Sequence, residues 1–160
     1  MSVVYLLLGG NMGDRKDYLE RARVSLSTDV GSIEAASLLY ETEAWGVKEQ
    51  APFLNQALKI NTLLEPVKLL NTILSIERAL GRTREAKYGP RTIDIDILLY
   101  DDYILNLPYL TIPHPFLPQR RFALQCLNAI APHIKHPLSG KTIHDLLQEC
   151  PDSSMVHKFA

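Results

Sequence analysis

A short, uninterrupted apolar run from Val3 to Leu8 is the strongest constraint on the fold of this chain. The run stops at Gly9-Gly10-Asn11, a pattern typical of a buried strand that ends in a turn. A strand without polar positions belongs in the interior of a sheet. We therefore expect residues 3–8 to form the first strand, at the centre of the sheet.

The segments that follow predict two helices and three more strands. Asp14 is a suitable cap for the first helix, and Pro66 stands where the second helix begins before running up to Gly81. The apolar stripe predicted for the second helix consists of Val67, Leu70, Ile73, Leu74 and Leu80. Strands are predicted at 33–40, 53–61 and 92–100, with a long loop at 41–52.

The predicted order is strand, helix, strand, strand, helix, strand. Two helices on one face of an antiparallel sheet in this order make the ferredoxin-like α+β fold. Four prolines between residues 108 and 118 are predicted to exclude regular structure before C-terminal helices at 121–131 and 143–148. A length of 160 residues is typical of one domain, so we expect a single domain over 1–160.

The charge balance excludes several classes of partner. With 17 basic and 18 acidic residues, the formal net charge of -1 gives no general attraction to nucleic acid or to an anionic membrane. The sequence shows no signal peptide and no apolar run of the roughly 20 residues that span a bilayer. We expect a cytoplasmic monomer without an obligatory protein partner, in which Cys126 and Cys150 are reduced and inert.

Asp94 and Asp96 share one face of the strand predicted at 92–100, because strand side chains alternate between faces. The residues predicted on the opposite face are Ile93, Ile95, Ile97 and Leu99. Two carboxylates about 4 Å apart repel by about 4 kcal/mol at an effective dielectric constant of 20, and a divalent cation between them turns this repulsion into attraction. Oxygen ligation by two Asp side chains suits Mg²⁺. A solvated strand edge is the alternative interpretation of the pair.

A basic segment leads directly into this strand. Residues 81–91 contain four cations and one acid, and cations beside a metal site suit a polyphosphate. Gly81, Gly89 and the polar residues between them predict a mobile segment that closes over a substrate, while an ordinary solvated loop is the alternative. Together these features predict a magnesium-dependent enzyme that transfers a phosphate-containing group from ATP to a small flat substrate.

Three other side chains fit substrate binding. Glu77 lies on the stripe of the second helix, where its carboxylate needs a partner such as Arg82, Arg84 or a ligand unless it lies at the edge of the stripe. Phe53 and Asn55 are two residues apart on a predicted strand, so a flat ring and an amide face the same way. That pair suits a planar heterocycle, and core packing is its alternative.

The segment Lys87-x-Gly89-Pro90-Arg91-x-x-Asp94-Ile95-Asp96-Ile97-Leu98 resembles the pattern of the hydroxymethyldihydropterin pyrophosphokinases of folate biosynthesis. The likeness continues through residues 8–11, 40–42, 53–55, 76–77 with 81–82, and 111–114. The resemblance implies a ferredoxin-like fold. It also implies transfer of the pyrophosphoryl group of ATP to 6-hydroxymethyl-7,8-dihydropterin, with AMP as the second product.

The resemblance further implies roles for individual residues. The implied catalytic residues are Arg82, Arg91, Asp94 and Asp96, of which the two Asp would bind two Mg²⁺ ions. The residues implied to bind ATP are Glu77, Arg82, Arg84, Arg91, Ile97, Thr111, His114 and Arg120. The residues implied to bind the pterin are Thr42, Glu43, Trp45, Phe53, Asn55, Asp94 and Phe122, with the ring between the two Phe side chains.

The chain departs from the family pattern at several positions. The loop Thr42-Glu43-Ala44-Trp45-Gly46 lacks the proline that the family usually has before the glycine, and Tyr88 stands where a Trp often occurs. Leu74 and Tyr109 replace polar residues that some members place near ATP, so those two contacts are not carried over. Pro115 after His114 is another difference at the adenosine end.

Two rival functions remain open from the residues alone. Nucleotidyl transferases also combine a glycine turn with an Asp-x-Asp pair, but they place the pair soon after the turn, and here more than eighty residues separate Gly10 from Asp94. A ferredoxin-like module that only binds a small ligand does not need an acidic pair beside a basic loop. Release of pyrophosphate instead of AMP identifies the first rival, and ATP binding without Mg²⁺ dependence or turnover identifies the second.

Overall fold

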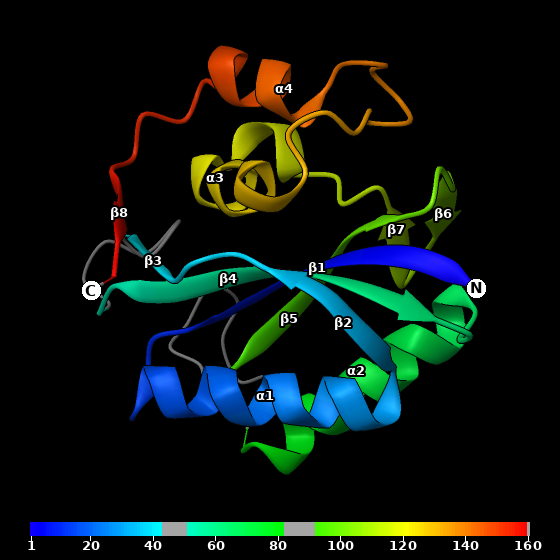
Figure 1. Cartoon of the computed structure of the whole chain (residues 1–160), viewed down its shortest axis with the longest axis vertical. Coiled ribbons are helices and arrows are strands. Elements are labelled where there is room, and N and C mark those ends of the chain that lie inside the picture. The colour runs from blue at the N-terminus through cyan, green and yellow to red at the C-terminus, as the bar shows by residue number, and fades with distance from the viewer. Residues whose placement is uncertain (43–50, 82–91, 160) are drawn as a thin grey trace.

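The computed structural model describes residues 1–42, 51–81 and 92–159. An antiparallel sheet separates two helical layers, with α1 and α2 on one face and α3 and α4 on the other (Figure 1). Each face has its own apolar core, so side chains that alternate along a strand enter different cores. The sheet is therefore buried on both faces over most of its area.

The strands of the main sheet follow the order β5-β1-β4-β3-β8, and β2 also pairs with β4. Their bounds are β1 (Ser2–Gly10), β2 (Gly31–Ala36), β3 (Tyr40–Thr42), β4 (Phe53–Thr62), β5 (Asp94–Tyr100) and β8 (Val156–Lys158). The strand predicted to be central is indeed β1, which pairs with β4 on one side and β5 on the other. The ferredoxin-like arrangement is confirmed.

Helices α1 (Arg15–Asp29) and α2 (Pro66–Ala79) begin at the predicted positions. The Asp14 carboxylate accepts a hydrogen bond of 3.1 Å from the Asp17 backbone N–H, which satisfies one of the free donors at the start of α1. In α2, Pro66 occupies the first turn, where a missing N–H costs no helical hydrogen bond. Both helix starts were therefore encoded locally.

The buried face of α2 differs from the predicted stripe. The buried residues of α2 are Leu69, Ile73, Ile76 and Glu77, and the C-cap residue Leu80 is buried as well. Val67 is exposed, and Leu70 and Leu74 are only half-buried. The apolar positions of α2 come in adjacent pairs that span a wide arc, so periodicity allows two similar faces and only packing against the sheet selects one.

Two glycines predicted to form a turn lie within a strand instead. Gly9 pairs with Asn55 and Gly10 pairs with Leu54, as the last two residues of β1. Gly9 also pairs with Asp94 of β5. The prediction of a turn here was wrong because partners on both neighbouring strands hold a backbone that has no strand preference of its own.

The strand predicted at 33–40 is interrupted at Ser37. Its Oγ accepts a hydrogen bond of 2.9 Å from the Ala57 N–H, while its own N–H donates to the Ala57 carbonyl oxygen at 2.9 Å. A serine side chain thus replaces a backbone group of the sheet, and the segment divides into β2 and β3. The short β3 leads directly to the loop whose sequence departs from the family pattern.

A bulge in β5 overturns one prediction about its faces. Leu99 pairs with Tyr5 whereas Ile97 pairs with Leu6, so Leu98 is an extra residue in the ladder. Leu99 consequently lies in the core under α3, on the opposite side from Ile97. Strict alternation therefore holds only before the bulge.

The proline-rich region contains a hairpin that was not predicted. Strands β6 (Leu105–Leu107) and β7 (Leu110–Ile112) pair with each other, with Pro108 in the turn between them. Pro113 follows β7, so neither proline removes a hydrogen bond from the ladder. A 3₁₀ turn at Leu117–Gln119 then leads to α3 (Arg121–Ile130), and α4 (Ile143–Glu149) follows, both as predicted.

The C-terminal segment joins the sheet and supports α3. Strand β8 pairs with β3 at the edge of the sheet, an element that the sequence analysis missed. Before it, the Asp152 carboxylate accepts a hydrogen bond of 3.0 Å from the Arg121 N–H at the start of α3. Burial alone would raise the pKa of Asp152, but hydrogen bonds from Ser154 and Arg121 outweigh this effect and lower it.

Candidate active site

Asp94 and Asp96 lie on one face of β5, and Ile95 and Ile97 lie on the opposite face. The two isoleucines are buried in the core with α1 and α2, while both carboxylates are half-buried on the other side of the strand. The Asp96 side chain retains 27% of its full exposure. The pair therefore faces the same way, as predicted, and stays accessible to a ligand.

A cavity of about 670 Å³ surrounds the edge of β5. Its walls are α2, β5 itself and the β6–β7 hairpin with the segment that follows it. The lining residues are Leu70, Asn71, Leu74, Glu77, Asp94, Ile95, Asp96, Ile97, Pro108, Tyr109, Leu110, Thr111, His114 and Pro115. The cavity thus brings together six residues predicted from separate parts of the sequence: Glu77, Asp94, Asp96, Ile97, Thr111 and His114.

Glu77 is 2% exposed and binds the backbone of β5. Its Oε2 accepts a hydrogen bond of 2.8 Å from the N–H of Ile95, the residue between the two aspartates. This N–H points away from β1, so the carboxylate takes the place of a missing neighbouring strand. Glu77 was predicted to bind ATP, and the structure adds a contact that fixes the strand bearing the acidic pair.

His114 presents a defined nitrogen to the cavity. Its Nδ1 accepts a hydrogen bond of 3.2 Å from the Phe116 N–H, so the neutral ring carries its proton on Nε2. Burial, and then the charge of Arg120, lower the pKa of His114 to about 4, against a smaller opposing effect of Asp94. Nε2 lies 4.0 Å from Asp96 Oδ1, and because the ring is neutral near pH 7 this contact is not an ion pair.

Arg120 lies between the cavity and the start of α3. Its guanidinium carbon is 5.0 Å from the centre of the Phe116 ring and 5.9 Å from that of Phe122, which are cation–π distances. Arg120 was predicted to bind ATP and Phe122 to bind the pterin. The structure places these two predicted residues in contact.

On the other side of β1, Asn55 of β4 is a buried amide with a free donor. The side chain is 3% exposed, and its Nδ2 has no hydrogen-bond partner in the described part of the chain. A buried donor without a partner costs about 1–3 kcal/mol, which a ligand acceptor would recover. Phe53, two residues earlier on the same face, is half-buried. The predicted amide and ring thus lie on one face of a central strand.

The sheet places these groups in a row. Asn55, Gly9 and Asp94 are successive partners across β4, β1 and β5, and partners in an antiparallel ladder point to the same face. Two strand spacings separate Asn55 from Asp94, which is roughly 10 Å. A buried amide and a half-buried carboxylate therefore face the same layer at the distance of a small molecule.

A family model described as 7,8-dihydro-6-hydroxymethylpterin-pyrophosphokinase (HPPK) matches residues 5–132, a span that includes the whole of this row and the cavity beside it. The chain belongs to this family. The predicted resemblance is therefore confirmed, and so is its activity: HPPK enzymes are pyrophosphokinases of folate biosynthesis that use ATP.

Relatives of similar length support the assignment to HPPK. The chain is 43% identical over 149 residues to the 2-amino-4-hydroxy-6-hydroxymethyldihydropteridine pyrophosphokinase of Aquifex aeolicus, covering 93% of this chain and 92% of the relative. It is 38% identical over 160 residues to the enzyme of the same name from Bacillus subtilis, covering 99% and 96%.

Solved structures support the fold. A triple mutant of Plasmodium falciparum HPPK-DHPS with SDX-DHP superposes with a TM-score of 0.78 at 20% identity, over 92% of this chain and 44% of that one. This chain therefore corresponds to less than half of the Plasmodium protein.

In the residues that the structure describes, no helix has the length and apolar character needed to cross a membrane.

The remaining predicted residues of the HPPK site divide into two groups. Glu43, Trp45, Arg82, Arg84 and Arg91 lie outside the described residues, as does the predicted closing segment. Thr42 is described and buried, and its hydroxyl donates a hydrogen bond of 3.2 Å to the Met155 carbonyl oxygen. Its side chain is thus bound by the C-terminal segment, and Thr42 itself pairs with Phe53 of β4 and with Val156 of β8.

Two residues that contact the segments flanking residues 43–50 were not predicted from the sequence. The Arg15 guanidinium pairs with Glu41 at 2.6 Å and donates to the Pro52 carbonyl oxygen at 3.1 Å, so it contacts both sides of residues 43–50. Asn11 Nδ2 donates to the Ala51 carbonyl oxygen at 3.0 Å. Asn11 belongs to the glycine-rich opening of the family pattern, which was the available signal.

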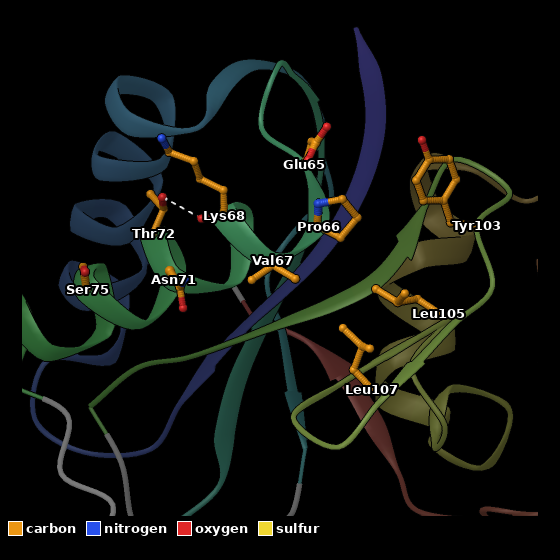
Figure 2. A pocket seen from close by; sticks show the side chains of 10 residues that line it. All are labelled: Glu65, Pro66, Val67, Lys68, Asn71, Thr72, Ser75, Tyr103, Leu105 and Leu107. Carbon is orange, nitrogen blue, oxygen red and sulfur yellow. Dashed lines mark hydrogen bonds between the residues drawn. The ribbon is translucent and has the colours of Figure 1, made fainter.

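A second hollow, of about 740 Å³, lies between the start of α2 and β6 (Figure 2). Figure 2 shows Val67, Leu105 and Leu107 along its apolar part, with Glu65 and Lys68 as its charged side chains. It is larger than the cavity at β5 but has no pair of carboxylates. The acidic pair, and not volume, therefore makes the cavity at β5 the candidate active site.

Proposed function

We propose that this HPPK chain transfers the pyrophosphoryl group of ATP to 6-hydroxymethyl-7,8-dihydropterin with two Mg²⁺ ions held by Asp94 and Asp96. The observation that carries the proposal is the row Asn55–Gly9–Asp94, which presents a buried amide and a metal-binding carboxylate to one layer. ATP occupies the cavity on the β5 side of the row. The pterin lies on the β4 side.

The donor set fits magnesium. Asp94 and Asp96 are half-buried oxygen ligands on one face, and Mg²⁺ commonly takes one or two carboxylates and completes its shell with water and substrate phosphate. Within residues 1–42, 51–81 and 92–159, no group of three or more His, Cys, Asp or Glu side chains forms a closed metal site. This arrangement suits an ion shared with a polyphosphate. When bound, Mg²⁺ supplies positive charge that neutralises the phosphate oxygens.

The side chains around the cavity position the nucleotide. Glu77 holds the Ile95 N–H and so fixes the strand that carries both aspartates. His114 directs an Nε2–H toward the cavity, where it acts as a neutral donor to a phosphate or sugar oxygen. Leu70, Leu74 and Ile97 provide apolar surface for the base. The predicted contributions of Arg82, Arg84 and Arg91 remain part of this proposal, as do those of Thr111 and Arg120.

On the β4 side, the pterin completes a site that the protein leaves unsatisfied. The Asn55 amide donates to an acceptor on the edge of the ring and replaces the partner that Nδ2 lacks. Phe53 and Phe122 flank the ring by offset stacking, and the backbone from Thr42 to Trp45 binds its polar edge. Holding both substrates in line lowers the barrier mainly by orientation and charge neutralisation.

A product assay tests the proposed reaction. Purified chain with ATP, Mg²⁺ and 6-hydroxymethyl-7,8-dihydropterin is expected to form AMP and a pterin diphosphate in equal amounts. Omission of Mg²⁺ with EDTA present should abolish both products. Release of pyrophosphate in place of AMP, or turnover that is unaffected by EDTA, contradicts the proposal.

We also propose that residues 1–160 form one domain that acts as a cytoplasmic monomer without an obligatory partner. The pairing of β8 with β3 supports a single domain, because it links the C-terminal segment to the N-terminal half of the sheet. Sedimentation velocity should show one species of about 18.0 kDa with full activity. Activity confined to a larger species contradicts the monomer.

A further inference from the structure

Gly9 occupies a position where the absence of a side chain matters more than backbone freedom. It lies in β1 between Asn55 and Asp94, and Figure 1 shows β1 between β4 and β5. Its φ angle is not in the left-handed region, so another residue could adopt the same backbone. The reason for glycine at this position must therefore be space.

The space is occupied by the Asn55 side chain. A Cβ built on Gly9 would lie 2.7 Å from Asn55 Oδ1, closer than real contacts allow. The next nearest atoms, Asn55 Cγ and the Leu54 carbonyl oxygen, are 3.7 Å away, which is ordinary van der Waals distance. The single conflict is thus with the end of one side chain.

The same contact defines the orientation of the amide. Oδ1 lies over Gly9, so Nδ2, on the opposite side of Cγ, points away from it. Nδ2 is buried and has no partner among the described residues. Because neighbouring residues Leu7 and Ala57 enter the core under α3, Gly9 and Asn55, two residues from each, face that layer too.

We propose that Gly9 is a positioning and specificity-determining residue for the pterin: its missing side chain lets the Asn55 amide lie across β1 with Nδ2 free for the ring. It also leaves bare backbone between Asn55 and Asp94, so a flat ring can lie along the row toward the carboxylate. This inference rests on the proposed function of Asn55. The proposed role of Gly9 is exerted through Asn55 and does not involve a contact with a phosphate group.

The test is Gly9→Ala in the full chain. The variant should fold, because the displaced atom belongs to a side chain that can rotate. The KM for the pterin should rise between about 5-fold and 100-fold, the range expected for a misdirected buried hydrogen bond, while the KM for MgATP stays within about twofold. A pterin KM within twofold of wild type overturns the proposal, as does an equal rise in both KM values.

A double-mutant cycle shows whether Gly9 acts through Asn55. In an Asn55→Ala background, Gly9→Ala should add less than about twofold to the pterin KM, because the displaced group is already absent. A full additional loss overturns the coupling. Val3→Ala changes the same face of β1 at its far end, opposite Asn61, and serves as the matched control with unchanged KM values.

A direct measurement covers the case in which Gly9→Ala does not fold. In the wild-type chain, the side-chain amide resonances of Asn55 should shift on addition of the pterin and not on addition of MgATP alone. No shift with the pterin overturns the inference. If the wild-type chain does not act on the pterin at all, the proposed function itself fails, whereas normal wild-type turnover with a normal Gly9→Ala pterin KM refutes only the role of Gly9.

Discussion

The two strands on either side of β1 carry different kinds of chemistry. On β4, the proposed pterin half of the site consists of Asn55 and Phe53, and β4 is paired along both edges by β1 and by β2 with β3. On β5, the proposed nucleotide half consists of Asp94 and Asp96 with His114. There, β1 pairs along one edge, while the Glu77 carboxylate and the His114 N–H bind the backbone on the other.

The difference agrees with the ligand that we propose for each half. A neutral ring is recognised by a desolvated donor in a rigid setting, and the amide of Asn55 is almost fully buried within a doubly paired strand. A metal polyphosphate needs accessible carboxylates, and Asp96 keeps 27% of its exposure on a strand at the sheet edge. A central strand and an edge strand of one sheet thus provide a desolvated site next to a solvent-accessible site.

The largest expected effect is a loss of catalysis from the proposed nucleotide half, with little change in pterin binding. Asp94→Ala and Asp96→Ala should each lower kcat by a factor of about 10³ or more, because they remove ligands for ions that neutralise several kcal/mol of phosphate charge. Pterin binding measured by titration without MgATP should change less than about threefold. An active Asp94→Ala, Asp96→Ala double variant contradicts the metal assignment.

The next largest effect is a loss of pterin affinity from the proposed pterin half, with no change in the affinity for MgATP. Asn55→Ala should raise the pterin KM by about 10-fold to 100-fold and leave the MgATP KM unchanged, since it removes a buried donor used by one substrate. Gln56→Ala is the matched control, because this neighbouring amide donates to the Ser37 carbonyl oxygen at 2.9 Å on the other side of the strand. Equal effects of Asn55→Ala and Gln56→Ala on the pterin KM would contradict a specific role of the Asn55 amide.

Substitution of Glu77 tests whether the edge of β5 that faces away from β1 depends on this side chain for its stability. Glu77→Leu should lower the free energy of unfolding by about 1–3 kcal/mol and raise the MgATP KM, because the Ile95 N–H loses its acceptor. Glu77→Gln keeps an acceptor and should recover most of that stability in chemical denaturation. The core variant Ile73→Val, with a loss of about 1 kcal/mol, controls for general destabilisation and should leave both KM values unchanged.

His114, in the proposed nucleotide half, gives the free energy of unfolding a pH dependence. Its pKa is lowered to about 4, so between pH 4 and 6.5 the unfolded chain binds more protons and the folded state is stabilised as pH rises. His114→Asn should reduce the rise in unfolding free energy over this interval in metal-free protein. A ring signal of His114 that titrates between pH 6 and 7 contradicts the neutral donor.

The smallest effect concerns the support of α3, which carries Phe122. Asp152→Asn should lower the free energy of unfolding by about 1 kcal/mol at pH 7, since a half-buried carboxylate close to solvent contributes little. The pKa of Asp152 is lowered, so its contribution is present above pH 4 and is lost as pH falls through the folded-state pKa. The difference in free energy of unfolding between Asp152→Asn and wild type should therefore be smaller in acid. Chemical denaturation at pH 7 and at pH 3 measures this difference.

Much of the fold could be predicted because its signals are local. The cap at Asp14, the proline at the start of α2 and the apolar run of β1 each specify an element through a few adjacent residues. The common faces of Asp94 with Asp96, and of Phe53 with Asn55, follow from the two-residue period of a strand. The hairpin β6–β7 was missed because its prolines resemble breakers until the pairing shows them outside the ladder.

The apolar run that opens the chain specified a central strand by itself, because a strand without polar positions has no stable place at a surface. Only the tertiary structure decided that Gly9 and Gly10 continue this strand, since Gly9 pairs with Asn55 and Asp94, 46 and 85 residues away in sequence, and Gly10 with Leu54, 44 residues away. It likewise decided that Glu77 holds Ile95 and that the Asn55 amide lies over Gly9. Residue types and local periods determine elements and faces, but contacts between distant residues exist only after the sheet has assembled.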